Sequence, residues 1–102
     1  MPTGVTAIRG TITGITGAEP PVVTSVAHGL SNGEFVKITE VDGPVQLNNR
    51  PYRVFNTTAD TFELQDPGNR ENVDASSLPA YFANGRWNRI DREEADRVFY
   101  QA

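Results

Sequence analysis

The chain has 102 residues, of which 37% are hydrophobic, and a formal net charge of −4. This length suits one domain with one small core, and the 9 glycines and 7 prolines favour a turn-rich β protein over a helical bundle. The acidic balance argues against a dedicated nucleic-acid binder, because neutralising phosphates requires a basic surface.

The first half of the sequence predicts three strands. Residues 5–16 are rich in Val, Ile and Thr, and Gly10 and Gly14 within them suggest a bulge or a sharp bend. Residues 22–27 form the second predicted strand. A reverse turn at Asn32-Gly33 leads into the third, residues 34–41, in which apolar and polar side chains alternate.

The second half predicts strands at 51–56 and 61–65, and then a final hairpin. Tyr52 and Val54 share one face of the first of these strands, and Phe62 and Leu64 share one face of the next. The final hairpin pairs residues 80–83 with the last predicted strand.

That last strand covers residues 86–90, and Asn84-Gly85 supplies the turn before it. We therefore expect an all-β fold, a small antiparallel β-barrel, over residues 1–90, with an N-terminal arm.

Residues 91–102 change character and predict a short C-terminal helical tail. Asp91 can begin a capping box, and Ala95, Val98 and Phe99 lie at helical spacing on one apolar stripe. A helix this short is marginal in isolation. The tail must therefore dock on its own barrel or on a neighbouring molecule.

The sequence offers little for catalysis. His28 is the only histidine, and its position just before a turn favours a structural role. Asp42-Gly43 and Asp66-Pro67 are typical of turns and lack the further ligands of a calcium loop. With no cysteine, thiolate metal sites are excluded. We expect a protein that is not an enzyme and holds no cofactor or metal.

No stretch approaches the ~20 apolar residues of a membrane span. The N-terminus also lacks the basic and apolar runs of a signal peptide. We therefore expect no membrane partner and synthesis in a cytosol, with export only as part of something larger.

Several short strings, taken in order, resemble a small β-barrel module of bacteriophage virion proteins. That module shares its name with the first-catalytic-cysteine half-domain of ubiquitin-activating enzymes, but no catalytic residue carries over to a chain without cysteine. The strings are Ala27-His28-Gly29-Leu30, Asn32-Gly33, Val36-Lys37-Ile38, Val41-Asp42-Gly43, Leu47-Asn48, Tyr52-Arg53-Val54 and Thr61-Phe62-Glu63-Leu64.

The resemblance implies a structural component of a phage particle: a tail, head–tail or capsid-surface protein present in many copies. It would be made in the host cytoplasm, reside in the virion and contact other virion proteins and copies of itself.

We expect the assembly contacts at the ends of the chain, since Arg and aromatic residues gather near the C-terminus as they do in protein interfaces. The expected interface residues are Trp87, Arg89, Ile90, Arg97, Val98, Phe99 and Tyr100.

Two other interpretations stay open for this segment, and one alternative function stays open for the chain. It can be ordinary core with a solvated face, or a nucleic-acid stacking patch, which the interleaved carboxylates disfavour. The alternative function is a receptor- or glycan-binding module with an aromatic platform made of Tyr81, Phe82 and Trp87.

Overall fold

The computed structural model describes residues 8–91, and the structural statements below refer to that range. The predicted N-terminal arm and, apart from Asp91, the helical tail predicted for residues 91–102 lie outside it. So do four of the expected interface residues, Arg97, Val98, Phe99 and Tyr100.

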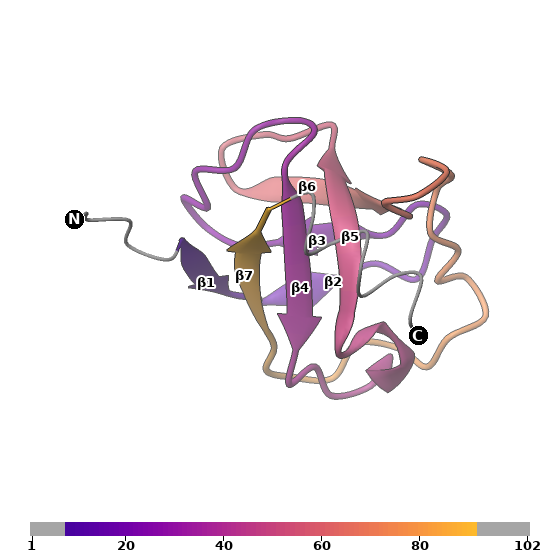
Figure 1. The fold of residues 1–102 in the computed structure, drawn as a ribbon. Helices are drawn as coiled ribbons and strands as arrows, with labels where there is room; N and C mark the ends of the chain where they lie inside the picture. Colours follow the sequence, from indigo (N-terminus) through magenta and orange to yellow (C-terminus); the bar gives the residue numbers. More distant parts are fainter. Residues whose placement is uncertain (1–7, 92–102) are drawn as a thin grey trace.

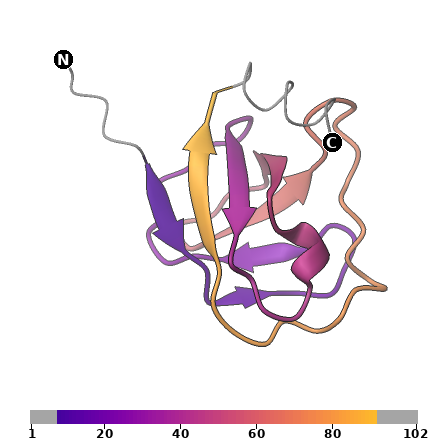
Figure 2. The same ribbon diagram turned by 60° about the horizontal axis from the view of Figure 1, so that its bottom comes forward.

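The fold is all-β, as the sequence predicts, and consists of one antiparallel sheet (Figure 1). Its elements in chain order are β1 (Arg9–Thr11), β2 (Gly14–Ile15), β3 (Val22–Thr24), β4 (Phe35–Thr39), the 3-10 turn η1 (Val45–Leu47), β5 (Arg50–Phe55), β6 (Thr61–Gln65) and β7 (Arg86–Ile90). The strand order is β1-β7-β4-β5-β6-β3-β2. Only Ile12 and Thr13 separate the two outermost strands, so the sheet curls into a barrel-like form (Figure 2).

The predicted strand 5–16 is wrong as a single element. The Ile12 N–H donates to Gly85 O at 2.9 Å, whereas the next residue, Thr13, donates to Thr24 O at 2.9 Å. Consecutive residues therefore pair with opposite ends of the sheet. The chain bends there, into β1 beside β7 and β2 beside β3.

The predicted strand at 80–83 is also wrong. This segment makes one isolated bridge, Asp42 to Ala83, and no continuous ladder. The turn that follows is where the sequence places it, since Asn84 and Gly85 both have positive φ, at 63° and 118°. The predicted strands 61–65 and 86–90 match β6 and β7 at both ends, whereas β3, β4 and β5 end one to three residues before the predicted bounds. Glu40, for example, has φ 63° and closes β4.

The core lies inside the curled sheet and follows the predicted alternation. Tyr52, Val54, Phe62 and Leu64 are all buried in one cluster. The Tyr52 hydroxyl donates to Leu47 O at 2.9 Å, and burial raises the pKa of this phenol. Apolar burial of this kind is the main favourable term in folding a domain of this size.

Candidate interaction surfaces

His28 is a packing residue in this fold. Its Nδ1 accepts from the Leu30 N–H at 2.8 Å, so the neutral ring carries its hydrogen on Nε2, which lies 2.9 Å from Thr61 O. The ring is 6% exposed and meets Phe62 edge-on, with centroids 5.2 Å apart. Both nitrogens are occupied by backbone groups, and neither is left to act as a base.

Within residues 8–91, no group of three or more His, Asp or Glu side chains lies close enough to hold a metal ion. In the same range, no helix is long and apolar enough to cross a membrane.

Trp87 is not a surface residue, which corrects both its place in the expected interface and its place in the aromatic platform. It is 1% exposed, because β7 directs it inward between Gly10 of β1 and Ile38 of β4. Its indole N–H donates to Ser25 Oγ at 2.8 Å, and Ser25 donates in turn to Thr11 O at 2.6 Å. Trp87 therefore connects β1, β4 and the residue after β3.

The other described members of the expected interface lie at the surface. Arg89 is exposed, and its Nη1 lies 3.0 Å from Glu34 Oε2. Ile90 is partly exposed and sits opposite Phe35 across the sheet.

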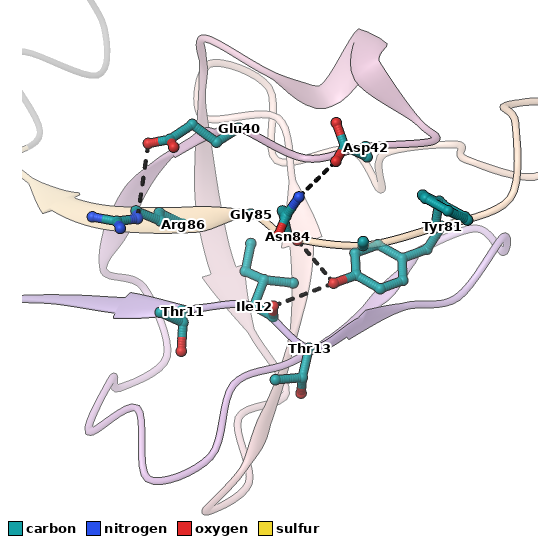
Figure 3. A pocket seen from close by; sticks show the side chains of 11 residues that line it. Thr11, Ile12, Thr13, Glu40, Asp42, Tyr81, Asn84, Gly85 and Arg86 are labelled. Carbon is teal, nitrogen blue, oxygen red and sulfur yellow. Dashed lines mark hydrogen bonds and ion pairs between the residues drawn. The ribbon is translucent and has the colours of Figure 1, made fainter.

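A hollow of about 780 Å³ opens where the segment before β7 crosses the bend in the first strand and the end of β4 (Figure 3). Its lining combines small hydroxyl residues, charged groups and two aromatic rings. The residues are Thr11, Ile12, Thr13, Glu40, Asp42, Tyr81, Phe82, Ala83, Asn84, Gly85 and Arg86.

Backbone contacts hold one wall of the hollow in place. The Phe82 N–H donates to Asp42 O, and the Asp42 N–H donates to Ala83 O, both at 2.9 Å. The Tyr81 hydroxyl lies 2.8 Å from Asn84 O and 3.3 Å from Ile12 O. Burial, and then the nearby Asp42 carboxylate, raise the pKa of Tyr81. That hydroxyl is therefore a structural donor.

Polar side chains line the hollow in pairs, as Figure 3 shows. Asn84 Nδ2 donates to Asp42 Oδ2 at 2.7 Å, and Arg86 Nε lies 3.8 Å from Glu40 Oε2. Phe82 is 82% exposed, the most exposed of the large hydrophobic side chains described. An exposed aromatic ring beside convergent polar groups suits binding of a ligand or partner.

No family model and no curated protein matches the chain. The strings that resemble the phage module can nevertheless be followed in the structure, where they serve the architecture. Asn48 caps both backbone groups of Val41, accepting from its N–H at 2.8 Å and donating to its carbonyl at 2.9 Å. Asn32 Oδ1 accepts from the Thr57 N–H at 2.9 Å.

The sequence did not reveal the polar members of the hollow. Asp42 reads as a turn residue and Asn84 as half of a hairpin signal, and both do shape turns. Nothing local shows that these two side chains bond to each other across 42 positions of sequence. The adjacent aromatic residues Tyr81 and Phe82 are the part of the sequence here that predicts a binding surface.

Proposed function

We propose that the chain is a non-enzymatic structural component of a bacteriophage virion, in the tail, at the head–tail junction or on the capsid surface. The observation that carries the proposal is that the phage-like strings form the turns and core of a small, curled, barrel-like sheet. The single histidine is occupied within that architecture. The partners in this proposal are other virion proteins and further copies of the chain.

The tail after residue 91 supplies assembly contacts in this proposal. It continues directly from the partly exposed Ile90 and carries Val98, Phe99 and Tyr100. A short helix with an apolar stripe needs a surface to cover that stripe. In a particle built from many copies, a neighbouring subunit provides the surface.

The tail contacts are tested by the full-length double variant Val98→Ser/Phe99→Ser. We expect the purified wild-type chain to form assemblies whose size grows with concentration, and the variant to remain a folded monomer in sedimentation velocity. Val26→Ser is the matched control, because Val26 is an equally apolar side chain that is 71% exposed on the barrel. If the double variant assembles as the wild type does, the tail is not the interface.

A second candidate, a receptor- or glycan-binding role, is favoured by one observation: Phe82 projects at 82% exposure beside the polar hollow. With Trp87 in the core, the platform reduces to Phe82 and its neighbours Asp42 and Asn84. A sugar ring would stack on the aromatic face while its hydroxyls bond to the amide and carboxylate.

Saturation-transfer NMR with neutral oligosaccharides such as maltotriose and chitotriose tests this role. We expect transfer to the wild-type chain and its loss in Phe82→Ala, whereas Val45→Ala, which truncates another exposed apolar side chain, retains it. Absence of transfer in the wild type, or equal transfer in Phe82→Ala, would rule the role out.

A further inference from the structure

The cations of this acidic chain are concentrated on one part of the folded sheet. Four strands that are adjacent in the sheet, β1, β7, β4 and β5, contain six of the nine Lys and Arg residues and no Asp or Glu. The six are Arg9, Lys37, Arg50, Arg53, Arg86 and Arg89.

The strand register brings three of these cations together on the outer surface. Asn88 of β7 pairs with Arg9 on one side and Lys37 on the other. Arg86 lies two residues before Asn88, on the same face of β7. Because Trp87 points into the core, its neighbours in β7 and their partners point outward. We call the surface of Arg9, Lys37 and Arg86 the basic face.

The cations of the basic face are weakly neutralised. Among the described residues, the side chains of Arg9 and Lys37 have no hydrogen-bond or ion-pair partner. Arg86 meets Glu40 at 3.8 Å, in a pair whose side chains are 61% and 66% exposed. Such an exposed pair contributes little by itself. The basic face is thus free to attract an anionic surface.

The opposite charge gathers around and after β6. Residues 60–74 contain five carboxylates against the single Arg70. Burial and then the nearby Glu71 carboxylate raise the pKa of Asp66, while Arg50 lowers it. Figure 1 shows β1 and β7 on the left and the segment after β6, which carries Asp66, Glu71 and Asp74, on the right. We call Glu63, Asp66, Glu71 and Asp74 the acidic region; Asp60 lies at the other end of β6, where its carbonyl accepts from the Ser25 N–H.

We propose that the basic face of one copy docks against the acidic region of the next, in a head-to-tail contact. This inference rests on the proposed multi-copy role and adds the surfaces through which the barrels themselves meet. Copies with net charge −4 repel one another unless they are oriented so that these unlike surfaces face each other. A contact between two different surfaces repeats from copy to copy and builds a ring or a tube.

Charge reversal tests the contact in the full-length chain. One variant carries Arg9→Glu/Lys37→Glu, and a second carries Glu63→Lys/Glu71→Lys. Arg9→Lys/Lys37→Arg keeps the charge and serves as the matched control. We expect each reversed variant alone to associate at least tenfold more weakly than the wild type in sedimentation velocity. An equimolar mixture of the two should associate again, since reversed faces are complementary to each other.

The salt dependence of self-association tests the head-to-tail contact independently. Association of the wild type should weaken at least tenfold when the screening length falls from about 10 Å at 0.1 M salt to about 3 Å at 1 M. The head-to-tail contact is wrong if the reversed variants associate normally, or if the mixture fails to recover. If the charge-reversed variants associate normally but the tail variant Val98→Ser/Phe99→Ser does not assemble, the head-to-tail contact is wrong and the proposed function is retained.

If the wild type is monomeric in every condition, both the head-to-tail contact and the proposed function are wrong. Binding of a DNA oligonucleotide that depends on Arg9 and Lys37, without self-association, would assign the basic face to nucleic acid instead.

Discussion

Trp87→Ala should lower the free energy of unfolding by roughly 3–5 kcal/mol, the range for removing a large buried aromatic side chain. Trp87 is 1% exposed, contacts Phe62 edge-on with centroids 6.3 Å apart and donates to Ser25 Oγ at 2.8 Å. Domains of this size are stable by only about 5–15 kcal/mol. Urea denaturation followed by circular dichroism measures the loss.

The control Trp87→Phe separates packing from hydrogen bonding. It keeps an aromatic ring against Phe62 but removes the indole N–H. Ser25 retains Thr11 O as the acceptor for its own hydroxyl. We expect Trp87→Phe to lose clearly less stability than Trp87→Ala. A loss under about 1 kcal/mol for Trp87→Ala, typical of exposed positions, would contradict its place in the core.

Gly43→Ala should be the most disruptive glycine-to-alanine change within residues 8–91, lowering the free energy of unfolding by roughly 3 kcal/mol or more. Gly43 has φ 105°, and a Cβ there would lie 2.2 Å from Ala80 O and 2.9 Å from Phe82 N. These are backbone atoms, so no side-chain rotation relieves the clash. The segment that carries Phe82 has to move.

Gly29→Ala is the matched control for that change. Gly29 also has positive φ, at 70°, but a Cβ there meets nothing within 4 Å. We expect it to lose only the conformational cost of about 1–2 kcal/mol for a left-handed residue. Urea midpoints compare the two variants, and amide chemical shifts around Asn84 report whether the hollow is displaced. Equal losses would show that the close approach at Gly43 is not a real constraint.

The strands with one buried face were predictable because alternation is a local signal. Tyr52 and Val54, like Phe62 and Leu64, point inward because the period of a strand is two. The strand proposed for 5–16 failed for a non-local reason: Ile12 and Thr13 pair with different strands. Gly10 and Gly14 predict a bulge or a bend, but nothing within residues 5–16 shows that the two halves pair with different strands.

The arginine and aromatic residues around Trp87 predict a place for it at the surface, which the structure contradicts. The alternation of residues 86–90 carried the better signal. Arg86 and Asn88 share one face of that strand, which leaves Trp87 on the other. In a short strand, the periodicity of the sequence is therefore a better guide to burial than the enrichment of arginine and aromatic residues.

The grouping of cations on the basic face could not be predicted from the sequence, for a different reason. A net charge of −4 averages the whole chain, and it led to the expectation that nucleic acid is an unlikely partner. Arg9, Lys37 and Arg86 are far apart in sequence and meet only because the strand order places β7 between β1 and β4. The hollow has the same origin, since Asp42 and Asn84 come together through tertiary structure.

The most direct test of the proposed virion role is the copy number of the chain in purified particles of a phage whose genome encodes it, measured by quantitative mass spectrometry against a major capsid protein. A structural role in the virion predicts a fixed, multiple copy number for the wild type, and particles that lack the chain when it carries Val98→Ser/Phe99→Ser. A chain that is absent from purified particles, or encoded outside any viral genome, would contradict the proposed role.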